Sequence, residues 1–168
     1  MSLFSGPLAV RTTALLAHCR AHGVKIATAE SCTGGLVAAL LTEIAGASDV
    51  FERGFITYSN AAKTGLLGVA RDLITREGAV SAAVARAMAE GALDRSAADL
   101  SVAVTGIAGP GGGSAEKPVG LVWFAIARRG AGAETVEKRF GDLGRSRVRL
   151  KAVETALDLL LAASGTPR

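Results

Sequence analysis

The chain has 168 residues, of which 49% are hydrophobic and only 4% aromatic, and its formal net charge is +4. This length is enough for one domain with its own core and without support from disulfides or metals. No run approaches the roughly 18 uninterrupted apolar residues of a membrane span, and residues 1–7 lack the basic start and apolar run of a signal peptide. We therefore expect a single domain over 1–168, in the cytoplasm and with no membrane partner.

The predicted elements alternate between helix and strand along most of the chain. Apolar residues at helical spacing, with Ser or Gly near several ends, predict helices over 8–21, 33–44, 60–67, 81–96 and 148–163. Strands are expected over 24–29, 54–58, 100–105, 120–128 and 134–140, with the last two joined as a hairpin at 130–132. This order predicts the α/β class: a three-layer α/β/α single domain with a mixed, mostly parallel sheet.

The two cysteines and two histidines do not form a metal-binding pattern. No C-x-x-C pair exists, Cys19 lies among apolar residues of a predicted helix, and His18 and His22 lie one turn apart near the end of that helix. We expect no metal and no cofactor.

The basic balance of the chain raises the question of a nucleic-acid partner. Basic residues gather only late, between Arg128 and Lys151, and no aromatic residues alternate with them as base stacking would need. A solvated helix face, or a site for a small anion such as a nucleotide phosphate, explains the cluster as well. We expect no nucleic-acid partner.

Ser31 follows a predicted strand and precedes a predicted helix. A hydroxyl on such a turn faces backbone N–H groups, which can stabilise the oxyanion that forms when a serine attacks a carbonyl. An ordinary helix cap is the alternative, because serine is a preferred capping residue. The adjacent Cys32 is the one thiol that could compete as a nucleophile.

Lys63 is the lysine best suited to act as a base. Its neighbours are small and apolar, and loss of solvation would lower the pKa of its amine. Ser–Lys pairs activate a hydroxyl without histidine. The alternative is a lysine that only extends to solvent from the start of a helix.

A glycine-rich segment, 105–114, follows the predicted buried strand 100–105 and should lie at the carboxyl edge of the sheet, where ligands bind in open α/β folds. Its glycines allow backbone N–H groups to close around an anion, although it matches neither a P-loop nor a dinucleotide fingerprint. A flexible surface loop is the alternative.

Together these segments resemble the CinA C-terminal domain family. The resemblance rests on TAESCTGG at 28–35, YSN at 58–60 followed by Lys63, GAVS at 78–81, TGIAGPGG at 105–112 and KPVG at 117–120, and it runs from about Leu8 to Ala163. Larger CinA proteins add an N-terminal domain that resembles a molybdopterin-binding one. The resemblance therefore implies the stand-alone form, a nicotinamide-mononucleotide deamidase of pyridine-nucleotide salvage.

The resemblance implies Ser31 as the nucleophile, Lys63 as the general base and Tyr58 as a supporting hydroxyl. The family often has Gly-Asp-Arg, whereas Leu143 and Gly144 here separate Asp142 from Arg145, so Arg147 and Arg149 stay open as alternatives for the phosphate-binding arginine. The expected substrate contacts come from the serine segment, the glycine-rich segment and this arginine: Cys32, Thr33, Gly34, Thr105, Gly106, Gly109, Gly111, Gly112 and Arg145. For Thr105, contact with the nicotinamide or its ribose is an alternative to contact with the phosphate.

Two other functions compete with the deamidase. One is a catalytically silent nucleotide-binding module linked to competence or DNA damage, which would need none of Ser31, Tyr58 and Lys63. The other is a DNA-binding protein, which rests on the net charge alone. The alanine-rich helices are also compatible with a homo-oligomer.

Overall fold

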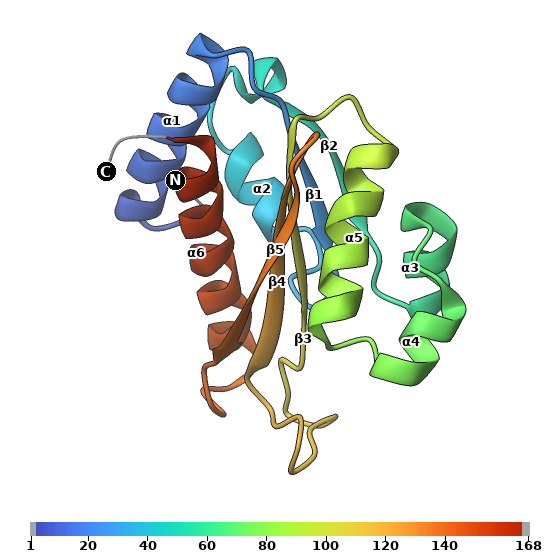
Figure 1. The fold of residues 1–168 in the computed structure, drawn as a ribbon. Coiled ribbons are helices and arrows are strands. Elements are labelled where there is room, and N and C mark those ends of the chain that lie inside the picture. Colours follow the sequence, from blue (N-terminus) through green and yellow to red (C-terminus); the bar gives the residue numbers. More distant parts are fainter. Residues whose placement is uncertain (1–2, 166–168) are drawn as a thin grey trace.

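The computed structural model describes residues 3–165, so Met1, Ser2 and residues 166–168 of the expected domain lie outside the described residues. Five strands form one sheet in the order β2-β1-β3-β4-β5 (Figure 1). The strands are β1 Ile26–Glu30, β2 Phe51–Ile56, β3 Leu100–Gly106, β4 Leu121–Arg128 and β5 Gly132–Arg139.

The sheet is mixed, as expected from the sequence, but it is not mostly parallel, because two of its four strand pairings are parallel and two are antiparallel. Strand β1 runs parallel to both of its neighbours, β2 and β3, whereas β4 is antiparallel to β3 and β5 is antiparallel to β4. Glu30 at the end of β1 is level with Ile56 of β2 and Val104 of β3. The carboxyl ends of the three parallel strands therefore meet at one edge of the sheet.

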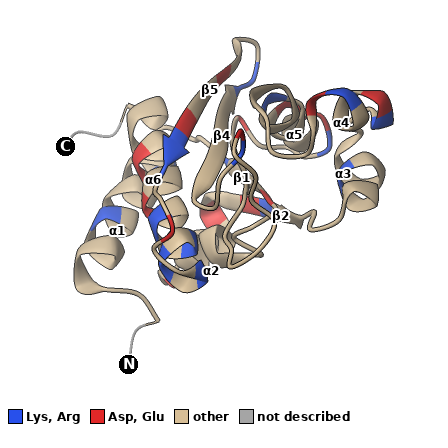
Figure 2. Cartoon of the chain, turned by 90° about the horizontal axis from the view of Figure 1, so that it is seen from below, with Lys and Arg blue, Asp and Glu red and all other residues tan. Residues whose placement is uncertain are grey.

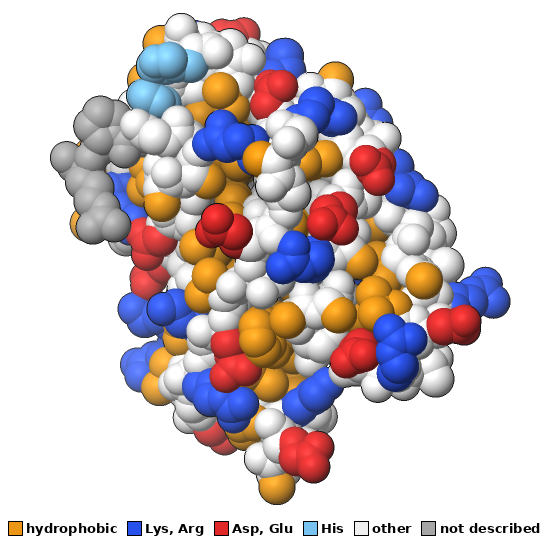
Figure 3. All heavy atoms as spheres, viewed as in Figure 1, with side chains coloured by type: hydrophobic (Ala, Val, Ile, Leu, Met, Phe, Trp, Pro, Cys, Tyr) orange, Lys and Arg blue, Asp and Glu red, His pale blue; other side chains and the backbone are white. Residues whose placement is uncertain are grey.

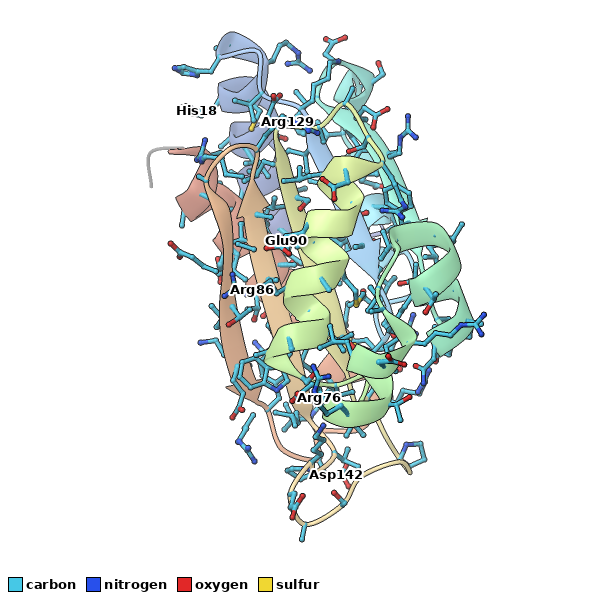
Figure 4. All side chains as sticks on the ribbon, turned by 45° about the vertical axis from the view of Figure 1, so that its right-hand side comes forward. His18, Arg76, Arg86, Glu90, Arg129 and Asp142 are labelled. Carbon is cyan, nitrogen blue, oxygen red and sulfur yellow. The ribbon has the colours of Figure 1, made fainter. Side chains whose placement is uncertain are left out.

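Helices cover both faces of the sheet and give the expected three layers (Figure 1). One face carries α1 Gly6–Ala21, α2 Leu36–Thr42 and α6 Arg145–Ser164. The other carries α5 Ala82–Asp94, against which α3 Asn60–Leu67 and α4 Arg71–Glu77 pack. In Figure 4, Arg86 lies on the side of α5 that faces β5, where its guanidinium donates a hydrogen bond to the carbonyl of Ala133.

The two halves of the core differ in the size of their side chains. Leucines, valines and Phe124 fill the face covered by α1, α2 and α6. The face covered by α5 consists mostly of alanine, including Ala29 and Ala103 of the sheet and Ala85 and Ala89 of the helix. Because alanine is small, these side chains let α5 pack close to the sheet.

Some element boundaries differ from those expected. Helix α4 and a short 3-10 helix over Ala47–Asp49 were not predicted, because each is short and presents a single buried apolar residue to the core. Helix α2 begins at Leu36 rather than at residue 33, because Gly34 and Gly35 have φ values of 58° and 99°, which end any helix there. Helix α6 begins at Arg145, three residues earlier than expected, which places its arginines in the first turns.

Candidate active site

Ser31 lies at the carboxyl edge of the sheet, directly after β1. Its N–H donates to the carbonyl of Val104 at 2.9 Å, and the N–H of Thr57 donates to the carbonyl of Glu30 at 2.7 Å. These bonds continue the ladders of β1 with β3 and β2, so Ser31 stands between Thr105 and Thr57. Only 9% of Ser31 is exposed.

The residues around Ser31 form a tight turn, which we call the serine turn (residues 31–35). Within it the N–H of Gly34 donates to the carbonyl of Ser31 at 3.0 Å. Among residues 3–165, no oxygen accepts a hydrogen bond from the N–H groups of Cys32 and Thr33. The turn therefore has two backbone N–H groups without an oxygen acceptor among the described residues, on the two residues that follow Ser31.

Lys63 extends from α3 to Ser31 and is 1% exposed. Its Nζ lies 3.0 Å from Ser31 Oγ and donates to the carbonyl of Thr57 at 2.9 Å. Burial lowers the pKa of the Lys63 amine from its usual range. A lysine that only extends to solvent is therefore the wrong interpretation, as is a helix-capping Ser31, since the Ser31 hydroxyl contacts this amine.

Cys32 is a poor competitor for the role of nucleophile. Burial, with a smaller contribution from the nearby Glu30, raises the pKa of the Cys32 thiol to about 12. A thiol with that pKa is protonated near neutral pH, and the thiolate is the reactive form of cysteine.

Arg145 connects three segments that are far apart in the sequence. Its Nη2 donates to the hydroxyl of Tyr58 at 2.7 Å, and its Nη1 donates to the carbonyl of Gly109 at 3.1 Å. The first turns of α6 that carry this arginine lie beside α2, at the carboxyl edge of the sheet (Figure 2). Tyr58 itself is 58% exposed, so its ring lies at the rim of the site.

Only part of the glycine-rich segment 105–114 lies close to Ser31 and the other residues of the candidate site. Thr105 is buried next to Ser31, and its hydroxyl donates to the carbonyl of Ala79 at 2.9 Å. At Gly106, a Cβ atom would come within 2.9 Å of the carbonyl of Leu121, so close strand packing accounts for this glycine. Gly111 and Gly112 lie in the exposed part of the loop and make no hydrogen bond to the other predicted site residues. Asp142 also lies at this end of the molecule (Figure 4).

Two further residues contact the serine turn and were not predicted to do so. The buried carboxylate of Glu30 accepts hydrogen bonds from the N–H groups of Gly35, Val37 and Ala38, at the start of α2. Arg149 donates to the carbonyls of Cys32 and Thr33. The sequence signal for Glu30 is an acidic residue at the end of an apolar strand just before a helix, whereas Arg149 was considered only as a phosphate ligand.

The remaining surface gives little indication of another kind of site. Within residues 3–165 no three His, Cys, Asp or Glu side chains gather as a metal site would need, and no helix has the length and hydropathy to cross a bilayer. On the face shown in Figure 3, basic and acidic side chains are interspersed. A cavity of about 410 Å³, lined by residues such as Leu100, Arg128 and Leu159, lies at the opposite end of β3 from Ser31.

The fold and the Ser31–Lys63 contact define an α/β protein with a potential nucleophile at the carboxyl edge of a mixed sheet. The model of the CinA C-terminal domain matches residues 9–164, and the chain belongs to this family.

Proteins similar to this chain differ in length. It is 52% identical to the nicotinamide-nucleotide amidohydrolase PncC of Escherichia coli K12, over 84% of this chain and 85% of that protein. It is 53% identical to a CinA-like protein of Akkermansia muciniphila over 89% of its own length, but it spans only 36% of that longer relative. A crystal structure of a competence/damage-inducible protein from Agrobacterium tumefaciens matches with a TM-score of 0.94 and 53% identity, over 96% of this chain and 98% of that one.

Proposed function

We propose that this chain hydrolyses the carboxamide of nicotinamide mononucleotide, releasing ammonia and nicotinic acid mononucleotide, as a reaction of pyridine-nucleotide salvage. The observation that carries the proposal is the 3.0 Å contact between Ser31 Oγ and the buried Nζ of Lys63. Two relatives support the choice of substrate by their names and coverage, since the PncC proteins of Escherichia coli and Shigella flexneri are 52% identical to this chain and about as long as it is.

The reaction would begin with a proton transfer within this pair. When Lys63 is neutral, its lone pair accepts the proton of Ser31 Oγ, which attacks the carboxamide carbon. The N–H groups of Cys32 and Thr33 would donate to the oxyanion of the tetrahedral intermediate. Lys63 then gives its proton to the amide nitrogen, the C–N bond breaks, and ammonia leaves an acyl-enzyme on Ser31.

The same lysine would complete the cycle. Neutral Lys63 takes a proton from a water molecule, and the resulting hydroxide attacks the acyl carbon. The second tetrahedral intermediate collapses, Ser31 Oγ leaves, and Lys63 returns the proton to it. Since each step uses Ser31, Lys63 and water, treatment with a chelator should leave the rate unchanged.

Arg145 and backbone N–H groups of the glycine-rich segment would hold the 5′-phosphate of the substrate, while Tyr58 would serve as a supporting hydroxyl. Arg145 lies beside this segment, since its guanidinium donates hydrogen bonds to the carbonyl of Gly109 and to the hydroxyl of Tyr58. Guanidinium groups bind phosphate oxygens strongly and with defined geometry. Binding energy from the remote phosphate would position the amide over Ser31.

The test is ammonia release from nicotinamide mononucleotide, with the acid product identified by mass spectrometry. Ser31→Ala should lower kcat by at least about 10⁴-fold, as knockouts of hydrolase nucleophiles do. Cys32→Ala is the matched control and should stay within about 10-fold of the parent, because a protonated thiol is not a nucleophile. Substrate binding without ammonia release by the parent protein would instead favour the silent nucleotide-binding module.

A further inference from the structure

Glu30 is a buried carboxylate whose hydrogen bonds all go to one short stretch of backbone. It is 1% exposed. Its Oε2 accepts from the N–H groups of Gly35 and Val37 at 3.0 Å each, and its Oε1 accepts from the N–H of Ala38 at 2.8 Å. These N–H groups have no partner within the helix because they lie at its start. Glu30 therefore attaches the end of the serine turn to β1.

Arg149 contacts the same turn through the opposite kind of backbone group. Its Nε donates to the carbonyl of Cys32 and its Nη2 to the carbonyl of Thr33, both at 3.0 Å. The guanidinium also lies over Gly34, where a Cβ atom would be 3.4 Å from Nη2. An acid from β1 thus holds N–H groups of this stretch while a base from α6 holds its carbonyl groups.

The bond from Arg149 to Cys32 also determines where a neighbouring N–H group points. In a planar trans peptide the carbonyl and the following N–H point in opposite directions. With the Cys32 carbonyl directed at Arg149, the N–H of Thr33 is directed away from it. This N–H is one of the two donors without an acceptor in the turn.

We propose that Glu30 and Arg149 are positioning residues of the active site. They hold the serine turn so that Ser31 Oγ stays on Lys63 and the N–H of Thr33 stays available to the oxyanion. Neither side chain is hydrogen-bonded to Ser31 Oγ or Lys63 Nζ, so both act through the backbone. The proposal rests on the proposed amide hydrolysis.

The experiment compares Glu30→Gln and Arg149→Met with Glu43→Gln as the matched control. Glu43 is the acid at the other end of α2, where it accepts a bond from the N–H of Leu3. In Glu30→Gln an NH2 group, which cannot accept a hydrogen bond, replaces one of the two carboxylate oxygens, while the size of the side chain is kept. We expect each positioning variant to lower kcat by about 10- to 100-fold with KM within about 3-fold, since small misplacements at a reacting centre cost this much. The control should stay within about 2-fold of the parent.

A purely stabilising role predicts a different result. In that case Glu30→Gln would lower the melting temperature and leave kcat of the folded protein unchanged, which would overturn the proposal, as would a rise in KM alone. If Glu30→Gln does not fold, the kcat of Arg149→Met still tests the proposal. The side chain of Arg149 is only half-buried on α6, so we expect this variant to fold. The double variant should lose less than the product of the two single losses, because both residues hold the same turn.

A second measurement separates this proposal from the proposed function. A fluorophosphonate probe reacts with an activated serine without any nucleotide: Oγ forms a P–O bond, the P–F bond breaks and fluoride leaves, and Lys63 accepts the Oγ proton. Labelling of Ser31 should slow in both positioning variants and not in Glu43→Gln. If the parent protein releases no ammonia, the proposed function fails, and the labelling rates still decide whether Glu30 and Arg149 position the serine. Equal labelling rates in all variants would contradict the proposal.

Discussion

The Ser31–Lys63 contact places a potentially charged amine where water does not reach. Burial lowers the pKa of Lys63, and no acidic side chain within residues 3–165 forms an ion pair with it. With its pKa lowered, the amine of Lys63 is neutral in a larger fraction of the molecules near neutral pH than that of a solvated lysine, so it is better suited to act as a base. Burying an amine that has no ion-pair partner also lowers the stability of the fold. Activity and stability therefore make opposite demands on this residue.

Replacing Lys63 with methionine should abolish activity and stabilise the protein. In the parent protein, kcat/KM should rise with pH through the lowered pKa, because the neutral amine is the base. Between the folded and unfolded pKa values the unfolded chain binds more protons, so the stability of the parent rises with pH in that window. We expect Lys63→Met to be about 1 kcal/mol more stable than the parent near neutral pH, with a gap that narrows at higher pH. Urea unfolding at several pH values measures this, and a methionine variant with activity and an unchanged pH profile would contradict the Ser–Lys pair.

The start of α6 carries three arginines within five residues, at 145, 147 and 149. Cations in a first turn interact unfavourably with the helix dipole, and this helix has no capping side chain. The hydrogen bonds of Arg145 to Tyr58 and Gly109 and of Arg149 to the serine turn offset that disadvantage. The arginines at the start of α6 thus connect it to two loops of the site.

If Arg145 binds the phosphate, nicotinamide riboside should be a much poorer substrate than the mononucleotide. We expect kcat/KM for the riboside to be lower by about 100-fold, because binding energy from the phosphate is lost. Arg145→Ala should shrink this ratio, mainly by slowing turnover of the mononucleotide. Arg147→Ala is the matched control, because it removes an exposed arginine of the same turn, and it should leave the ratio intact. If only Arg147→Ala changes this ratio of kcat/KM values, phosphate binding would be assigned to Arg147 instead of Arg145.

The site depends on the packing of all three layers. Ser31 comes from the sheet, Lys63 from α3 on one face, and Arg145 and Arg149 from α6 on the other. Helix α3 is held partly through α5, where Gly91 approaches the carbonyl of Leu67 so closely that a Cβ atom would overlap it. The position of Lys63 is therefore linked to a contact one turn further along its own helix, at Leu67.

Gly91→Ala should lower both stability and activity, although alanine is the better helix former. The new methyl group would meet the carbonyl oxygen of Leu67, and overpacking of this kind costs about 1–3 kcal/mol. Gly65→Ala is the matched control, since Gly65 lies in α3 with open space around its Cβ position. It should raise the free energy of unfolding by about 0.5–1 kcal/mol and leave kcat unchanged. Equal stabilities of the two variants would show that the α3–α5 contact is not tightly packed.

Local patterns in the sequence were sufficient for the class of fold and for much of the candidate site. The alternation of helices and strands predicted the mixed sheet and its three layers, and the strand-to-helix position of Ser31 and the apolar surroundings of Lys63 predicted two side chains that the structure brings within 3.0 Å. Their catalytic roles, and the substrate contacts expected of Thr105, Gly109 and Arg145, stay predictions.

Only the tertiary structure decided which distant groups meet. Nothing local indicates that Arg149 donates to carbonyls more than a hundred residues earlier, or that Arg145 joins Tyr58 to Gly109. The sequence shows Glu30 as an acidic residue between a strand and a helix, but only the structure shows that its carboxylate accepts hydrogen bonds from N–H groups at the start of α2. The physical reason is that residue type and periodicity determine local conformation and burial, whereas a hydrogen bond between elements depends on the packing of the helices on the two faces of the sheet.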